Sequence, residues 1–335
     1  MLEGKNPTVT KANTRHRNGR TNIWIEKSMS NKTPHERPRE ERFVARSYLV
    51  VPASDAHMVQ KALASDSDQV VIDLEDAVAI AAKNEARRSL SDTLAAAAPG
   101  RVLVRVNAPG TPWCHLDISA CAKLPAVHSI VVPKVSNAGD LAFVDRLISG
   151  IEAGGVRAMQ LEVHALIETA EGLVNLNDIV NATPRLTAIV LGYADLAASL
   201  GLPQIPSTLA SEVWMSVQQR IVETARSAGI APVTGPYLGV DDGSDFVDSI
   251  TRTVTVGFDG AWVIHPRQVD VVNVQFGPAS AQLERAKAII EALAEAELAG
   301  RGAVALDGQM LDEAVALGAR RLLSRARTTD AGVTV

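Results

Sequence analysis

The stretch VVIDLEDAV, residues 70–78, shows the pattern on which the fold depends. A short apolar run rich in β-branched residues ends in the acids Asp73, Glu75 and Asp76, and a longer helical pattern follows. From Val44 onward the same order of apolar run and helical pattern recurs along the chain. Such alternation is typical of repeated βα units, which build a parallel sheet.

Eight apolar runs have the length and composition of strands. They cover residues 47–51, 69–73, 102–106, 129–133, 160–167, 188–191, 231–236 and 260–264. Helical patterns lie between them, as at 77–98, 138–153, 171–181, 208–228 and 242–256. Eight parallel strands with crossover helices close most naturally into a (β/α)8 TIM barrel. A doubly wound open sheet is the alternative, but no Gly-rich phosphate loop follows the first strand, where the sequence is PASD (52–55).

The two ends of the chain differ from this repeating part. Residues 1–43 are polar, lack helical or strand periodicity, and are predicted to form a flexible N-terminal arm. A transit peptide is an alternative for this basic stretch, and a second hypothesis is that Met29 is the natural start. The barrel is predicted at 44–278. Residues 279–335 hold a long helix (279–299), a short segment (303–314) and another helix, and we expect this tail to act as a lid or to reach a neighbouring subunit.

Composition excludes several classes of protein. The 335 residues are 47% hydrophobic and 21% charged, which is typical of a globular protein with a sizeable core. A net charge of -5 gives no basic field for nucleic acid. The two cysteines, Cys114 and Cys121, suggest neither a disulfide framework nor a zinc site. No run is long and apolar enough for a membrane span or a secretory signal, so the expected location is the cytoplasm.

Polar residues collect at one end of the predicted strands. In TIM barrels the chemistry lies at the C-terminal ends of the strands, whereas solvated surface residues would be scattered over both ends. Here the charged and amide side chains stand at or just past the C-terminal ends of strands two to six. They are Asp73, Glu75, Asp76, Arg105, Asn107, Lys134, Glu168 and Asp195. This distribution favours an active site.

Glu168 and Asp195 are the predicted metal ligands. Each could alternatively cap the helix that follows it, since acids are favoured at helix N-termini. Two carboxylates at the ends of adjacent strands, however, would converge and repel each other unless a cation lay between them. Oxygen ligands favour Mg²⁺, with Mn²⁺ as the second choice, over zinc.

Three further side chains at this end have competing interpretations. Arg105 is expected to bind an anionic ligand, and the alternative is a salt bridge to Glu75 or Asp76. Lys134 could form a Schiff base, but nearby carboxylates should raise its pKa, so a structural partnership with the acids of strand two is favoured. His265, which precedes a proline, is interpreted as a turn residue.

Nine motifs in register resemble the citrate lyase β-subunit-like branch of the HpcH/HpaI aldolase superfamily, which includes malyl-CoA and citramalyl-CoA lyases. The resemblance extends from Arg46 to about residue 319. The motifs are RSYLVVPASD (46–55), VVIDLEDAV (70–78), KNEAR (83–87), VRVNAPGT (104–111), VVPKV (131–135), LIETAEGL (166–173), GYADLAASLG (192–201), GFDGAWVIHPRQV (257–269) and DGQMLDEA (307–314).

The resemblance implies a function and a set of site residues. The activity would be Mg²⁺-dependent cleavage of a 3-hydroxyacyl-CoA, such as malyl-CoA or citramalyl-CoA, to a 2-oxo acid and an acyl-CoA. Glu168 and Asp195 would bind Mg²⁺, and Arg105 would contact the substrate's oxygens. Glu75 and Asp76 would support Arg105 and the waters of the metal.

The resemblance also implies contacts farther from the metal. Lys61 and Arg46 would face the CoA phosphates. Asp312, in the tail, would enter the active site of a neighbouring subunit as the catalytic acid/base. The family forms trimers or dimers of trimers, which gives the tail a reason to exist.

Departures from the family pattern leave the substrate open. Ala53, Ala194 and Ala314 replace a usual glycine, acid and proline, and His57 stands where the family has a lysine. The alternatives are a free 2-keto-acid aldolase without CoA, a malyl-CoA thioesterase, and a non-catalytic subunit of a citrate lyase-like complex.

Overall fold

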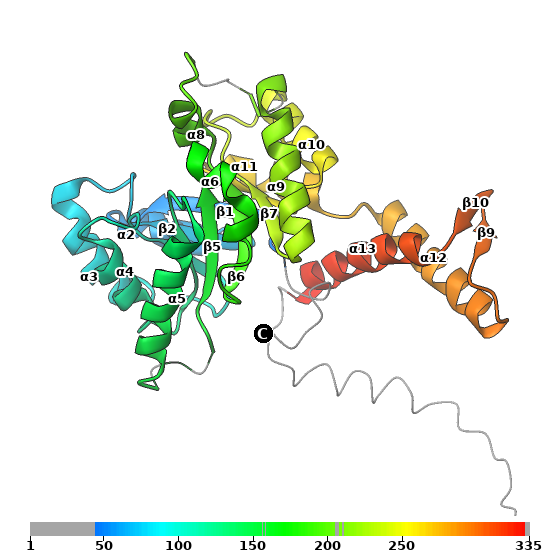
Figure 1. Cartoon of the computed structure of the whole chain (residues 1–335), viewed down its shortest axis with the longest axis horizontal. Coiled ribbons are helices and arrows are strands. Elements are labelled where there is room, and N and C mark those ends of the chain that lie inside the picture. Colours follow the sequence, from blue (N-terminus) through cyan, green and yellow to red (C-terminus); the bar gives the residue numbers. More distant parts are fainter. Residues whose placement is uncertain (1–43, 156, 158, 205–207, 210, 332–335) are drawn as a thin grey trace, which may run out of the picture. The chain divides into compact units, whose positions relative to one another are not determined.

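A computed structural model describes residues 44–155, 157, 159–204, 208, 209 and 211–331. Within these, eight parallel strands close into a barrel in sequence order, and the first pairs with the eighth. Figure 1 shows the strands surrounded by helices. The strands are β1 (Ser47–Pro52), β2 (Gln69–Asp73), β3 (Val102–Arg105), β4 (Val127–Val132), β5 (Glu162–Ile167), β6 (Leu186–Leu191), β7 (Ala231–Thr234) and β8 (Gly260–Val263). The (β/α)8 prediction is therefore confirmed, and every predicted strand boundary lies within two residues of the observed one.

Helices follow the strands as crossover connections. In the barrel they are α2 (Ala56–Leu63), η3 (Ile80–Ala82), α3 (Lys83–Thr93), α4 (Cys114–Cys121), α5 (Ala138–Glu152), α6 (Ala170–Val174), α7 (Leu176–Ile179), α8 (Tyr193–Ser199), η4 (Glu212–Trp214), α9 (Met215–Ala228), α10 (Ser244–Val256) and α11 (Arg267–Phe276). Asp55 caps α2 by accepting the N–H of Met58, and Asn137 caps α5 in a capping box with Asp140.

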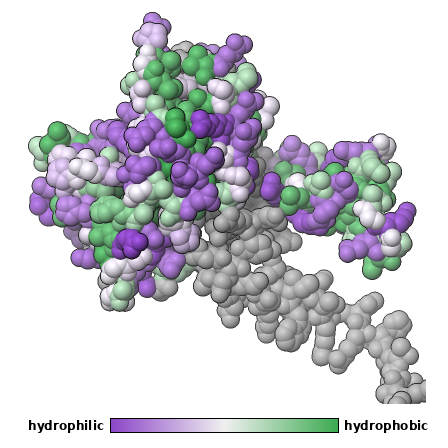
Figure 2. Space-filling view, viewed as in Figure 1, coloured by the Kyte–Doolittle hydropathy of each residue, from purple (hydrophilic) through white to green (hydrophobic). Residues whose placement is uncertain are grey.

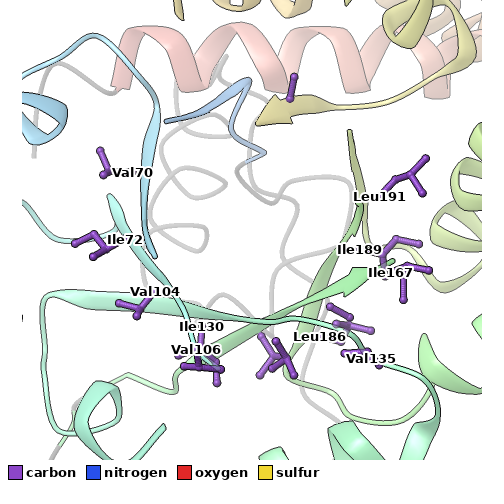
Figure 3. Close-up of a cluster of buried hydrophobic side chains, with 14 of the residues drawn as sticks. Val70, Ile72, Val104, Val106, Ile130, Val135, Ile167, Leu186, Ile189 and Leu191 are labelled. Carbon is purple, nitrogen blue, oxygen red and sulfur yellow. The ribbon is translucent and has the colours of Figure 1, made fainter. Parts of the chain in front are cut away.

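The barrel interior is filled by one layer of apolar side chains to which every strand contributes. Its members are Tyr48, Val71, Leu103, Val131, Leu166, Val190, Val233 and Trp262, joined by Ala45 and Ala188. Successive residues of a strand point to opposite faces, so the alternate positions face the helices. Figure 3 shows this outer layer, in which Ile72, Val104, Ile130 and Ile189 point away from the barrel axis.

The C-terminal segment has a small core of its own. Helices α12 (Ser280–Leu298) and α13 (Glu313–Ala331) pack on each other through Ala286, Ile289 and Ala319. Between them lies an antiparallel hairpin of β9 (Val304–Leu306) and β10 (Gln309–Leu311). Its two turn residues, Asp307 and Gly308, have φ of 51° and 78°, as a type I′ turn requires. The hairpin replaces the plain segment expected between the two helices.

The surface mixes polar and apolar residues. Figure 2 shows apolar side chains dispersed among hydrophilic ones on the visible face. No helix in the described part of the chain combines the length and hydropathy that a membrane crossing needs. The predicted arm at 1–43 and the hypothesis about Met29 fall outside the described residues.

Candidate active site

Period-two alternation brings the polar residues of the strand ends onto the inner face of the barrel. Val71, Leu103 and Leu166 belong to the inner apolar layer. Asp73 and Arg105, each two residues beyond its apolar neighbour, therefore point the same way. Glu168, two residues beyond Leu166, continues this face just after β5 ends. These side chains meet at the C-terminal ends of the strands, which we call the mouth.

Arg105 is held by two carboxylates. Its Nε donates to Asp73 Oδ1 at 2.7 Å and its Nη2 to Asp73 Oδ2 at 2.5 Å, while Nη1 lies 3.2 Å from Glu75 Oε2. Burial lowers the pKa of the guanidinium, but Asp73 and Glu75 outweigh it and the pKa is raised. The salt bridge to Glu75 that was the alternative interpretation of Arg105 is present, and Asp73 is a second partner. Among the described residues only Nε and Nη2 donate hydrogen bonds, both to Asp73, so three of the five N–H groups of Arg105 remain for a ligand.

Asp73 is the partner that the sequence analysis did not assign. Its fully buried carboxylate accepts the N–H groups of Glu75 at 2.8 Å and Ala77 at 3.0 Å besides the two Arg105 donors. Burial raises the pKa of this carboxyl, yet the hydrogen bonds and charge of Arg105 prevail and lower it. Asp73 is therefore an ionised anchor for Arg105 and for the turn after β2. The sequence could have shown this, because Asp73 stands two residues beyond Val71 and so points to the same inner face of the strand.

Lys134 connects the acids of β2 with Glu168. Its Nζ donates to Glu75 Oε1 at 2.6 Å and approaches Asp76 Oδ2 at 3.4 Å, and its backbone N–H donates to Glu168 Oε1 at 2.9 Å. The backbone is left-handed, with φ of 53°, which is uncommon outside glycine and is found at functional sites. Burial lowers the pKa of the ammonium, but Glu75 and Glu168 outweigh it and the pKa is raised. A protonated structural partner fits this geometry, and a Schiff-base lysine does not.

Glu168 is a buried carboxylate in an acidic neighbourhood. Its side chain is 3% exposed, and burial, followed by the charges of Glu75 and Asp195, raises its pKa to about 8. Asp195, in the first turn of α8, is half-buried. Gly192 makes room for this arrangement, because a Cβ there would lie 2.6 Å from Glu168 Oε2. The structure thus brings the two predicted metal ligands together.

The donor set fits a hard divalent cation. Among the described residues, the carboxylates of Asp73, Glu75, Asp76, Glu168 and Asp195 gather around two cationic side chains, Arg105 and Lys134, so negative charge is in excess. In the described part of the chain no three His, Cys, Asp or Glu side chains are arranged to hold a metal ion. Two carboxylates alone suit Mg²⁺, which keeps several waters and takes further oxygens from substrate.

Arg46 lies at the other end of the barrel. It precedes β1 and forms a bidentate pair with Asp68, at 2.7 and 2.9 Å, just before β2. Both residues stand before their strands, so they belong to the N-terminal face and not to the mouth. Arg46 therefore cannot share the mouth with Glu168, and the predicted CoA contact is corrected to a structural ion pair.

The remaining predicted residues are more exposed. Lys61 lies in the last turn of α2 with its side chain in solvent, and Asp76 is exposed at the rim of the mouth. Asp312 is exposed, and its Oδ1 accepts the N–H groups of Ala314 at 3.0 Å and Val315 at 3.2 Å, as a cap of α13. His265 Nδ1 accepts the N–H of Arg267 at 3.2 Å, in keeping with a turn residue.

Comparison with known proteins identifies relatives along most of the chain. A (3S)-malyl-CoA thioesterase of Cereibacter sphaeroides is 36% identical over 283 residues, covering 84% of this chain and 94% of that protein. An L-malyl-CoA/beta-methylmalyl-CoA lyase of Rhodobacter capsulatus is 33% identical over 285 residues, covering 80% and 90%.

A solved structure agrees with these relatives. The CitE protein of Mycobacterium tuberculosis, in complex with magnesium, acetoacetate and coenzyme A, is 31% identical and superposes with a TM-score of 0.68. The match covers 84% of this chain and 98% of that one. The family model for HpcH/HpaI aldolase/citrate lyase matches residues 46–266, almost the whole barrel. The chain therefore belongs to the HpcH/HpaI aldolase/citrate lyase family.

Proposed function

We propose that this protein is a Mg²⁺-dependent carbon–carbon lyase that cleaves a 3-hydroxyacyl-CoA of the malyl-CoA type into a 2-oxo acid and an acyl-CoA. The observation that carries the proposal is the buried Glu168 beside Asp195, opposite an Arg105 that keeps N–H groups for a ligand. Relatives named as malyl-CoA lyase and malyl-CoA thioesterase support the substrate class. The magnesium and coenzyme A bound to CitE support the cofactor and the thioester.

Glu168 and Asp195 would hold the metal, and its chemistry when bound is Lewis-acid polarisation of the hydroxyl and carboxylate oxygens of the substrate's 2-hydroxy-acid end. Lys134 donates its backbone N–H to Oε1 of Glu168 and so fixes the orientation of the carboxylate that would hold the cation. Because the Glu168 carboxyl has a pKa of about 8, it must give up its proton as the site fills.

Arg105 would stabilise the other half of the reaction. When the carbon–carbon bond breaks, the hydroxyl oxygen loses its proton to solvent and becomes the carbonyl of the 2-oxo acid. The electron pair of the broken bond becomes the enolate of the acyl-CoA. The N–H groups that Arg105 does not donate to Asp73 suit this negative oxygen, and the contacts with Asp73 and Glu75 fix the orientation of the guanidinium before the substrate arrives.

Asp312 is the proposed donor of the proton that returns to the enolate carbon. As an exposed residue on a C-terminal segment with its own core, it suits a group delivered to another subunit's mouth. We infer a homotrimer or a dimer of trimers in which this segment is shared, a cytoplasmic location, and CoA phosphates bound near Lys61. No nucleic-acid or membrane partner is proposed.

A thioesterase is the second candidate, because the relative named (3S)-malyl-CoA thioesterase shares more identical residues with this chain than the lyase does, 36% against 33%. The same site would bind the same substrate. Water would then attack the thioester carbonyl and release free CoA with the carbon skeleton intact.

Two products separate these reactions in one assay. Purified protein with Mg²⁺ is given malyl-CoA, citramalyl-CoA or a free 4-hydroxy-2-keto acid, and 2-oxo acid and free thiol are both measured. A lyase releases 2-oxo acid from the CoA substrates without free thiol, and a thioesterase releases thiol without 2-oxo acid. Cleavage of the free acids alone would indicate an aldolase without CoA. Folded, Mg²⁺-loaded protein that is inactive on all of them would refute the proposal and favour a structural subunit.

A further inference from the structure

Lys83 is a buried cation close behind the mouth. It is the first residue of α3, its side chain is 6% exposed, and its Nζ donates to the carbonyl oxygens of Leu74 at 3.0 Å and Glu75 at 2.8 Å. The ammonium also lies 5.4 Å from the centroid of the Trp113 ring. Among the described residues no carboxylate forms an ion pair with it. Both of its hydrogen bonds therefore go to the backbone of the Leu74–Glu75 turn.

This placement is unfavourable for stability. A positive charge at a helix N-terminus opposes the helix dipole, and a buried charge without a carboxylate partner has a desolvation cost. Neither carbonyl depends on the lysine for a partner. Leu74 O also accepts Asn107 Nδ2 at 3.0 Å, and Glu75 O accepts the N–H of Val78 at 3.1 Å. Removing the ammonium would leave both oxygens hydrogen-bonded.

The turn that Lys83 holds carries the acid that joins the two cations of the mouth. Glu75 binds Arg105 Nη1 through Oε2 and Lys134 Nζ through Oε1, at 3.2 and 2.6 Å. Lys134 in turn donates its N–H to Glu168. A shift of the Leu74–Glu75 backbone would therefore reach the metal carboxylate through two short contacts.

We propose that Lys83 is a positioning residue, which fixes the backbone of Glu75 and through it the Arg105–Lys134–Glu168 arrangement. The inference rests on the Mg²⁺ site of the proposed function. A positioning role explains why Lys83 is buried without a carboxylate partner among the described residues, although both carbonyls have other hydrogen-bond donors. Unfavourable burial is tolerated where it sets the geometry of a functional site.

Arg101 offers a matched control. Like Lys83, it donates its side-chain hydrogen bonds, among the described residues, to backbone carbonyls alone, those of Leu63, Ser65 and Ser67 at 2.7 to 2.9 Å. It precedes β3 and so lies at the N-terminal face of the barrel. Arg101 thus represents a structural cation far from the mouth, and Lys83 can be compared with it within the same chain.

The test compares Lys83→Met and Arg101→Met in the full-length protein. Mg²⁺ affinity is measured by titration calorimetry without substrate, kcat and KM by product release, and stability by thermal unfolding. Residues that orient metal ligands typically change metal affinity by 10- to 100-fold, so Lys83→Met is expected to weaken Mg²⁺ binding by about 10-fold. It should lower kcat by about 10-fold through misplacement of Arg105, with KM and Tm nearly unchanged. Arg101→Met should lower Tm and leave Mg²⁺ affinity and kcat as they were.

The proposal is overturned if Lys83→Met keeps the Mg²⁺ affinity and the kcat of the wild type. It is also overturned if Arg101→Met loses as much Mg²⁺ affinity as Lys83→Met does. If Lys83→Met does not fold, Lys83→Leu is judged by the same criteria. If the wild-type protein binds Mg²⁺ but cleaves no CoA thioester, the proposed substrate is refuted. The role of Lys83 is then tested by the Mg²⁺ affinities of the two variants alone. Wild-type protein that binds no Mg²⁺ would overturn both proposals.

Discussion

Mg²⁺ binding should depend steeply on pH, because Glu168 must lose a proton before it can bind a cation. Burial and the nearby Glu75 and Asp195 raise the pKa of its carboxyl from 4.5 to about 8. A group with that pKa is about 1% ionised at pH 6, about 9% at pH 7 and about 90% at pH 9. The apparent affinity for Mg²⁺ should therefore rise by about 10-fold from pH 6 to pH 7 and level off above pH 8.

The stability of the metal-free protein should change in the opposite direction. Since the folded-state pKa lies above the ordinary value, the folded protein holds this proton more tightly than the unfolded chain between pH 4.5 and about 8. The free energy of unfolding should then fall as pH rises through that interval, by at most about 5 kcal/mol, and the slope should end above pH 8. Added Mg²⁺ should restore more stability at pH 8 than at pH 6.

Titration calorimetry from pH 6 to 9 measures the affinity, and urea unfolding with and without Mg²⁺ measures the stability. Glu168→Gln should abolish most of the binding together with its pH dependence. Glu171→Gln, three residues along at the exposed start of α6, is the control and should behave as wild type. A Mg²⁺ affinity that is flat from pH 6 to 9, with tight binding at pH 6, would refute the reasoning.

Three substitutions test other parts of the mouth. Gly192→Ala places a Cβ 2.6 Å from Glu168 Oε2 and should weaken Mg²⁺ binding by about 10-fold in calorimetry; unchanged affinity would show that the carboxylate can move aside. Asp73→Asn removes the charge that anchors buried Arg105 and should lower the free energy of urea unfolding by about 3 kcal/mol, whereas wild-type stability would contradict that anchoring role. Asp312→Asn should reduce kcat by about 100-fold while Mg²⁺ affinity stays at the wild-type value, and unchanged kcat would remove Asp312 from the mechanism.

The barrel could be predicted from the sequence because each strand is a short apolar run followed by polar residues. The tail hairpin was missed although Asp307 and Gly308 are a strong turn signal, because the runs on either side are only three residues long.

The residues of the site were predicted by their position at strand ends, and their partners were not. Glu75 and Asp76 were expected beside Arg105, whereas Asp73 is the main partner, because the β2–β3 register sets Asp73 directly across from Arg105. Register arises from packing of the whole barrel and cannot be read from one strand.

Arg46 illustrates the opposite error. A family motif assigned it to CoA, although a residue that precedes a strand lies at the N-terminal face, where Asp68 pairs with it. The left-handed backbone of Lys134 was also beyond prediction, since a glycine or asparagine is the residue expected at such a φ.

The position of a bound Mn²⁺ ion tests the Glu168–Asp195 site most directly. Crystals grown with Mn²⁺ and a 2-oxo acid would locate the metal by anomalous diffraction. We predict one strong peak at the mouth, within metal–oxygen bonding distance of a carboxylate oxygen of each residue, with the remaining ligands supplied by water and the oxo acid. A mouth without a peak, or a metal bound elsewhere while Glu168 and Asp195 stay unliganded, would contradict this assignment.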